Sequence, residues 1–285
     1  MFNPYKGMKN LSKRSPGVAL HSRYDPLNDF LFYKIMGEKE DEVQLLGFIN
    51  AVLGKTEDDK FTSIEILENK TFSPEIIGDK SVTLDVRAVL HGKTKVNVEV
   101  QLRNEYNMDK RSLFYWSKEF STSLNKGQDF NELPDVIAIN IVNFNYLDTK
   151  GYHSCFRLRD EKERDIILTG ALEIHFINMV RFRKEKRDLS DPLTRWLIWL
   201  DKNSPPELLE EVLKMDPDLL SAEERLAYLA GDEDMIHLYN RRFMASCDYT
   251  SGMNHARNEG RNEERKRILE LLNQGISIEE LKQHL

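Results

Sequence analysis

The chain is poor in cysteine and has no long apolar run. Its 285 residues contain only two cysteines, Cys155 and Cys247, which lie far apart in the sequence. So few thiols exclude a disulfide framework and favour a reducing compartment. No stretch approaches the ~18 apolar residues of a membrane span, and the N-terminus lacks the apolar core of a secretory signal. We therefore expect a cytoplasmic protein without a membrane partner.

Three catalytic or binding motifs are also missing. Gly54-Lys55-Thr56 is not a phosphate-binding loop, because Ile49 stands where that motif needs its first glycine. The seven histidines show no paired metal spacing, and no Gly-x-Ser-x-Gly elbow occurs. These absences exclude the simplest nucleotide-binding, histidine-paired metal and serine hydrolase interpretations.

Acidic residues exceed basic ones, but this excess of negative charge is concentrated in one segment. The net charge of the chain is −7, and residues 201–235 alone contain 11 acids and 3 bases, a local charge of −8. The first 24 residues contain five bases and no acid, and Arg181–Arg187 forms a second basic run. Basic runs are more often solvated surface than phosphate sites. The acidic total therefore does not exclude a nucleic-acid partner, and the basic runs alone do not establish one.

Two alternating segments predict a β-hairpin with a pair of acids across it. Apolar and polar residues alternate through Ser81–Leu90 and again through Lys95–Leu102, which is typical of half-buried strands. If His91-Gly92-Lys93 is a three-residue turn, Leu90 pairs with Thr94 and Asp85 lies opposite Glu99. A four-residue turn would place the two acids on opposite faces.

Two acids facing each other at roughly 5 Å repel each other unless something compensates. A bound cation or a shared proton would compensate, and two carboxylates can hold Mg²⁺ together with water molecules. Such an ion activates water and stabilises the transition state of phosphodiester hydrolysis. Gln101 follows on the same face and can orient a group without deprotonating it. The alternative is a solvated hairpin face whose acids are bridged by Arg87 or Lys95.

The remaining pattern predicts an α/β fold with a mixed sheet, flanking helices and a C-terminal helical region. A helix opened by Asp25-Pro26 should end at Gly37, and Ser221-x-x-Glu224 is a capping box for another. The predicted strands and helices have these bounds: helices about 25–37, 41–53 and 109–124; strands 64–67, 135–142, 156–158 and 172–179; then helices 191–200, 206–214, 221–230, 233–245, 258–272 and a short one capped by Ser277.

The hairpin and its neighbours resemble the PD-(D/E)xK nuclease-fold transposases, also called recombination-promoting nucleases. The likeness runs from about Asp25 to Phe182, and more loosely into the charged tail, and several blocks occur in the family's order. These blocks are Asn28–Gly37, Phe48–Leu53, Leu84–Val86, Asn97–Gln101, Lys110–Ser117 and Leu172–Ile177. Tyr33, Met36 and Asn178 depart from the family pattern.

The resemblance implies a restriction-endonuclease-like fold and a DNA endonuclease that uses Mg²⁺ or Mn²⁺. It implies that Asp85 and Glu99 are metal ligands and that Gln101 replaces the catalytic lysine. Asp29 would be the acid of the first helix, unless it only favours the helix N-terminus. Arg111 and Tyr115 would contact DNA phosphates, unless they belong to an ordinary helix surface.

On this basis we expect four parts: a basic arm (1–24), a nuclease-like domain (25–188), a helical region (189–250) and a charged helical tail (251–285). The tail would be a packing or homodimerisation element, or a small helix-turn-helix.

Two other functions stay open. A catalytically inactive DNA-binding or assembly protein would retain the fold, and a retaining glycosidase would also place two carboxylates ~5 Å apart.

Overall fold

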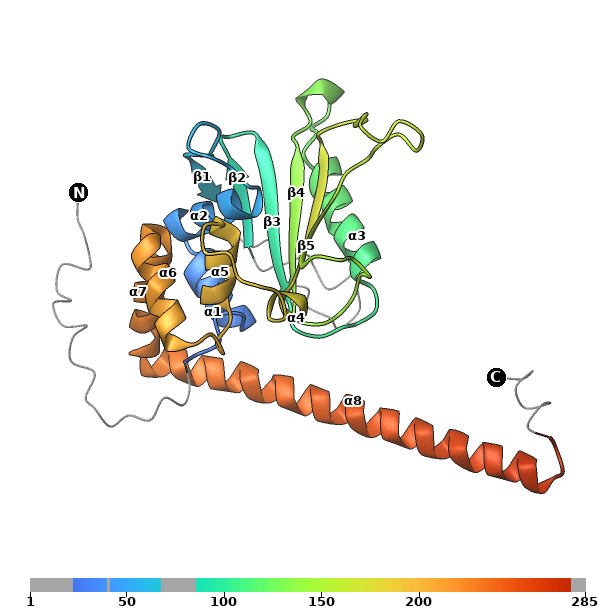
Figure 1. The fold of residues 1–285 in the computed structure, drawn as a ribbon. Helices are drawn as coiled ribbons and strands as arrows, with labels where there is room; N and C mark the ends of the chain where they lie inside the picture. The colour runs from blue at the N-terminus through green and yellow to red at the C-terminus, as the bar shows by residue number, and fades with distance from the viewer. Residues whose placement is uncertain (1–22, 40–41, 68–85, 278–285) are drawn as a thin grey trace. The chain divides into compact units, whose positions relative to one another are not determined.

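The computed structural model describes residues 23–39, 42–67 and 86–277 (Figure 1). The chain divides into two compact units, with the division between Ala230 and Gly231. The first unit contains a sheet and seven helices within its described residues, and the second contains one long helix. The four-part division predicted from the sequence stays a prediction.

The first unit is built on a six-stranded mixed sheet. Its strand order is β1-β2-β3-β4-β6-β5, with parallel pairing from β3 through β4 to β6 and antiparallel pairing elsewhere. The strands are β1 (Ile64–Ile66), β2 (Val86–Leu90), β3 (Thr94–Gln101), β4 (Val136–Val142), β5 (His153–Phe156) and β6 (Leu172–Asn178). Every residue of β4 is buried, as its continuous apolar sequence predicts for a central strand.

The hairpin has the predicted register. Val86 pairs with Val98 and Leu90 with Thr94, so His91-Gly92-Lys93 is a three-residue turn. Gly92 adopts a φ of 67°, a conformation that glycine reaches without steric cost. Asp85, the predicted partner of Glu99, lies outside the described residues.

Helices cover both faces of the sheet, which confirms the predicted α/β class. Figure 1 shows α3 on one side and α1, α2 and α5 on the other. The elements of this unit are α1 (Asp29–Met36), α2 (Glu42–Val52), α3 (Met108–Ser121), the 3-10 turn η2 (Phe130–Glu132), α4 (Met179–Phe182), α5 (Pro192–Leu200), α6 (Pro206–Met215) and α7 (Pro217–Ala230). The largest buried side chains include Trp196 and Phe48, whose rings meet edge to face at 5.8 Å.

Two predicted helix starts were wrong. The first helix begins at Asp29, because the Asn28 side chain accepts hydrogen bonds from the backbone N–H groups of Phe30 and Leu31. Ser221 does not cap a helix, because α7 already begins at Pro217. Inside α7 the Ser221 hydroxyl accepts a hydrogen bond from Gln44 Nε2 at 3.1 Å. Ser221 fits the capping-box pattern, but in the structure its side chain joins α7 to α2.

The predicted N-terminal arm and the predicted strand at 156–158 differ from the structure in extent or in coverage. The predicted basic arm lies outside the described residues up to position 22. Arg23 donates hydrogen bonds to the Trp199 carbonyl and to Glu223. The strand predicted at 156–158 is observed at His153–Phe156, because its pairing with β6 begins three residues earlier.

The second unit consists of α8 (Glu233–Asn273), a helix of 41 residues. Its N-terminus is capped by Asp232, whose side chain accepts from the N–H groups of Asp234 and Met235. The sequence predicted two helices here, but the chain continues as one through Gly252 and Gly260. The predicted short helix after Ser277 lies outside the described residues. Within the described part of the chain, no helix combines the length and apolar character required to cross a membrane.

Candidate functional site: a buried carboxylate beneath α3

The sheet face covered by α3, here called the α3 face, has an apolar half and a polar half. Over β4 and β6, Met108 of α3 packs in one buried cluster with Ala138, Val142, Ile174 and Phe176. Over β2 and β3, the same helix covers polar side chains. These are Arg87, Lys95, Asn97, Glu99 and Gln101, which strand alternation and pairing place on one face. The polar half therefore needs partners from α3.

Glu99 is the most deeply buried acid of this polar half. Its side chain is 2% exposed, and the guanidinium of Arg111 in α3 forms an ion pair with Oε1. Apart from this ion pair, neither Glu99 oxygen has a hydrogen-bond partner among the described residues. Burial raises the pKa of Glu99, and the positive charge of Arg111 opposes this only in part. The carboxylate thus retains unused capacity to accept further interactions.

Gln101 and Asn140 flank Glu99. Gln101 is the last residue of β3 and is partly exposed, two residues along the same strand face. Asn140 of β4 is the direct cross-strand neighbour of Glu99. Its Oδ1 accepts a hydrogen bond from Ser112 Oγ at 2.9 Å, and its Nδ2 donates to the His175 carbonyl at 3.0 Å. Asn140 therefore ties α3, β4 and β6 together beside the carboxylate.

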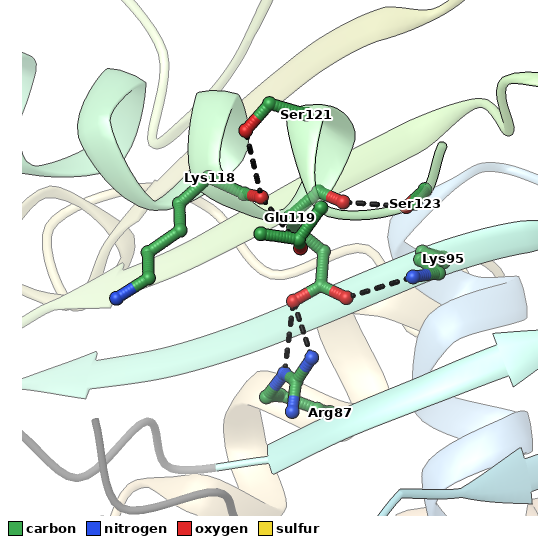
Figure 2. Close-up of polar contacts among 7 residues, drawn as sticks. Arg87, Lys95, Lys118, Glu119, Ser121 and Ser123 are labelled. Carbon is green, nitrogen blue, oxygen red and sulfur yellow. Dashed lines mark hydrogen bonds and ion pairs between the residues drawn. The ribbon is translucent and has the colours of Figure 1, made fainter. Parts of the chain in front are cut away.

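A second acid, Glu119, lies further along α3 and is fully engaged (Figure 2). Arg87 of β2 donates to its Oε2 through two nitrogens, with Nε at 3.0 Å, and Lys95 of β3 donates to its Oε1 at 3.1 Å. Burial by itself raises the pKa of Glu119, but the hydrogen bonds and charges of Arg87 and Lys95 outweigh it and lower the pKa. This network fastens α3 to the hairpin.

The alternative of a solvated hairpin face is wrong. Arg87, Asn97 and Glu99 are all buried, because α3 covers the face that carries them. The described contacts of Arg87 and Lys95 lead to Glu119 on the helix. Sequence alternation identified the polar face correctly but did not reveal what covers it.

Arg111 and Tyr115 were predicted to contact phosphates from α3. Arg111 lies between two acids, with Glu99 on one side and Glu105 Oε2 at 3.5 Å on the other. Its side chain is 21% exposed. Tyr115 is 6% exposed, and Arg111 lies over its ring at 5.7 Å. Arg111 is therefore part of the Glu99 site, and Tyr115 supports it from beneath.

Asp29 occupies the first turn of α1, where an acidic side chain is favourable towards the helix dipole. The described contacts of its carboxylate include the N–H group of Phe30 at 2.7 Å. This geometry agrees with the local interpretation of Asp29, and its catalytic role stays a prediction. The predicted pair of Asp85 and Glu99 also stays a prediction, since position 85 is outside the described residues.

The site contains residues that sequence reasoning missed. Glu119 follows Tyr115 by four residues and Ser112 by seven, a spacing that places all three on one side of a helix. Asn140 is the one polar side chain within the apolar run Val136–Val142. Both signals were present in the sequence, but neither shows which strand the residues meet. That information comes only from the packing of α3.

The chain matches one known protein family over most of its length. Residues 26–256 match the family model described as PD-(D/E)XK nuclease family transposase. No curated protein and no solved structure matches the chain at a significant level. The matched region includes the sheet, α3, the carboxylate of Glu99 and the first part of α8. The chain belongs to the PD-(D/E)XK nuclease family transposases.

Proposed function

We propose that this protein is a metal-dependent DNA endonuclease that hydrolyses phosphodiester bonds in recombination or transposition. The observation that carries the proposal is Glu99: a buried carboxylate without a hydrogen-bond partner among the described residues, at a place where α3 leaves an arginine beside it. A buried acid with so few partners lowers the stability of the fold, and ionisable groups with perturbed pKa values cluster at functional sites. Membership of a nuclease family supports phosphodiester chemistry over the sugar hydrolase alternative.

The donor set fits a divalent cation that prefers oxygen ligands. Glu99 offers two carboxylate oxygens, and Asp85 is the second ligand proposed from the sequence. Mg²⁺ or Mn²⁺ is suited to such oxygen donors and keeps several water molecules. Once bound, the ion would supply an activated water molecule and stabilise negative charge on the phosphate. The fit of the site to a divalent cation rests on the two Glu99 oxygens that accept no hydrogen bond among the described residues. It does not require a complete set of ligands from the protein.

The surrounding residues have separate tasks in this proposal. Gln101 lies on the same strand face as Glu99 and orients the attacking water or a phosphate oxygen through its neutral amide. Arg111 neutralises Glu99 in the absence of metal, and its exposed part attracts the DNA phosphate. Asn140 holds α3 against β4 and β6 beside Glu99. Asp29 and Tyr115 act as further catalytic and DNA-contacting residues, as the resemblance implies.

The test is cleavage of supercoiled plasmid by the purified full-length protein with Mg²⁺. We expect nicked or linear product from the wild type and about 10²–10³-fold slower cleavage by Glu99→Gln, a loss of about 3–4 kcal/mol of transition-state stabilisation. Asp85→Ala should behave in the same way. Glu65→Gln is the matched control, because Glu65 is an exposed glutamate on β1 of the same sheet.

Equal cleavage by the wild type and Glu99→Gln would reject the site. The alternative of an inactive DNA-binding or assembly protein has its own signature. In that case the wild type would bind DNA in a salt-dependent manner and give no product with Mg²⁺ or Mn²⁺. The neutral Gln101, which stands where related nucleases often have lysine, is the feature that favours this alternative.

A further inference from the structure

A group of side chains of the types that can ligate a metal lies at the β5–β6 edge of the sheet. Cys155 of β5 is the direct cross-strand partner of His175 of β6. Glu173 lies two residues before His175 and therefore projects from the same face. Glu173 pairs with Ile137 of β4, and Glu99 pairs with Asn140 of the same strand. Ile137 and Asn140 are three residues apart and therefore project from opposite faces, so the group lies on the face opposite to Glu99. It is separate from the proposed nuclease site.

The three side chains converge on one point. One ligand atom from each residue, a sulfur, a carboxylate oxygen and a ring nitrogen, lies within 4.8 Å of the other two. His175 Nε2 is 2.7 Å from Glu173 Oε1. Tetrahedral zinc with bond lengths of 2.0–2.3 Å separates its ligand atoms by about 3.3–3.8 Å. Displacements of the three ligand atoms by a few tenths of an ångström to about one ångström are therefore sufficient to admit an ion.

Neighbouring residues hold two of these ligands in position. His153 Nε2 is 2.9 Å from His175 Nδ1, and the two rings stack with centroids 5.1 Å apart. This contact occupies Nδ1 and leaves Nε2 directed at Glu173. Arg157 forms an ion pair with the other oxygen, Glu173 Oε2, at 2.8 Å. Partners of this kind fix the orientation of ligating histidines and carboxylates in metal sites.

The exposure of the group suits a metal that enters from solvent. His175 is 3% exposed and Glu173 15% exposed at the side chain, whereas Cys155 is an exposed residue. The buried histidine and the partly buried glutamate are therefore held by the fold, and the thiol can close over an ion from the outside. A mixed sulfur, nitrogen and oxygen donor set favours Zn²⁺ and disfavours Mg²⁺, which prefers oxygen alone.

We propose that Cys155, Glu173 and His175 form a Zn²⁺ site, with His175 ligating through Nε2, Glu173 through Oε1 and a water molecule in the fourth position. Binding releases the thiol proton of Cys155 to solvent, since thiolate is the ligating form. The ion joins the edge strand β5 to β6 and thereby fixes the end of the sheet. The inference does not depend on the proposed nuclease activity.

The test is binding of Co²⁺ and Zn²⁺ to the untagged full-length protein. Co²⁺ bound to a thiolate gives a sulfur-to-metal charge-transfer absorption, which oxygen and nitrogen ligands alone do not give. We expect this absorption to saturate at one equivalent of Co²⁺ and to disappear when Zn²⁺ is added. Cys155→Ser should abolish the absorption, and Glu173→Gln should weaken Zn²⁺ binding 10–100-fold or more.

The chain supplies its own matched control, because Cys247 is its only other cysteine and is also exposed. Cys247→Ser should retain the full absorption, and Glu99→Gln should bind Zn²⁺ like the wild type. The proposal is overturned if the wild type gives no charge-transfer absorption, if Cys155→Ser retains it, or if Cys247→Ser loses it. Circular dichroism of each variant verifies that a loss of binding does not reflect unfolding.

Discussion

Glu99 and Glu119 are two acids buried under the same helix, but their surroundings differ. Glu119 receives hydrogen bonds from Arg87 and Lys95 at both oxygens, and its pKa is lowered. Glu99 has one ion pair and no hydrogen bond among the described residues, and its pKa is raised. Two carboxylates that are chemically alike therefore hold their charge at very different cost.

From this difference we assign different roles to the two acids. A buried charge with a complete set of partners fixes the packing of the elements it joins. A buried charge with an incomplete set lowers the free energy of unfolding and is retained where a ligand completes the set. We therefore assign Glu119 to the attachment of α3 and Glu99 to the proposed metal site.

The largest effect should come from removing the structural acid. Glu119→Ala leaves Arg87 and Lys95 without their common partner and should reduce the free energy of unfolding by about 3–5 kcal/mol. Urea denaturation followed by circular dichroism measures this change. Glu65→Ala, at an exposed position, should shift the midpoint little. A similarly small shift for Glu119→Ala would show that the network adds nothing to stability.

The next effect concerns metal ions. At a Mg²⁺ concentration 100 times the dissociation constant, binding should stabilise the wild type by about 2.7 kcal/mol and raise its melting temperature. Glu119→Gln should have a lower starting temperature but retain the increase, whereas Glu99→Gln should lose it. Thermal denaturation with and without Mg²⁺ measures both. An increase of the same size in Glu99→Gln would place the ion elsewhere.

A smaller effect should follow from neutralising Glu99 without metal. Glu99→Gln removes a buried charge, and Arg111 can turn its 21% exposed side chain further into solvent. We expect the free energy of unfolding to stay constant or rise by about 1 kcal/mol, while Glu119→Gln lowers it. Paired denaturation curves in the presence of a chelator test this. A clear loss of stability in Glu99→Gln would mean that its pairing with Arg111 is structural.

The smallest effect should be a difference in pH dependence. The pKa of Glu119 lies below its ordinary value of 4.5 in the folded state, so the unfolded state binds its proton more tightly. The stabilisation is present above about pH 4.5 and is lost as the pH falls through the folded pKa. The wild type should therefore lose stability more steeply than Glu119→Gln in this acid range. Parallel slopes for both proteins would contradict the assignment.

The sequence predicted those parts of the site that depend on local periodicity. Alternation gave the register of the hairpin, because a shift of one residue would have exposed the apolar face. The apolar run of β4 gave its central position. The contacts of Glu119 and Arg111 were beyond this reasoning, because they depend on how α3 docks across strands far away in the sequence. The Ser221 error has a different, local origin, since α7 begins at Pro217, and proline is favoured in the first turn of a helix.

Asn140 connects the two sides of the molecule that carry the proposed metal sites. Its amide bonds the hydroxyl of Ser112, which neighbours Arg111, and the backbone carbonyl of His175, whose ring belongs to the other site. Because protein interiors are closely packed, a displacement of β6 relative to β4 would strain the hydrogen bond between the Asn140 amide and the His175 carbonyl. One buried amide thus bridges the helix that carries Arg111 and the strand that carries His175.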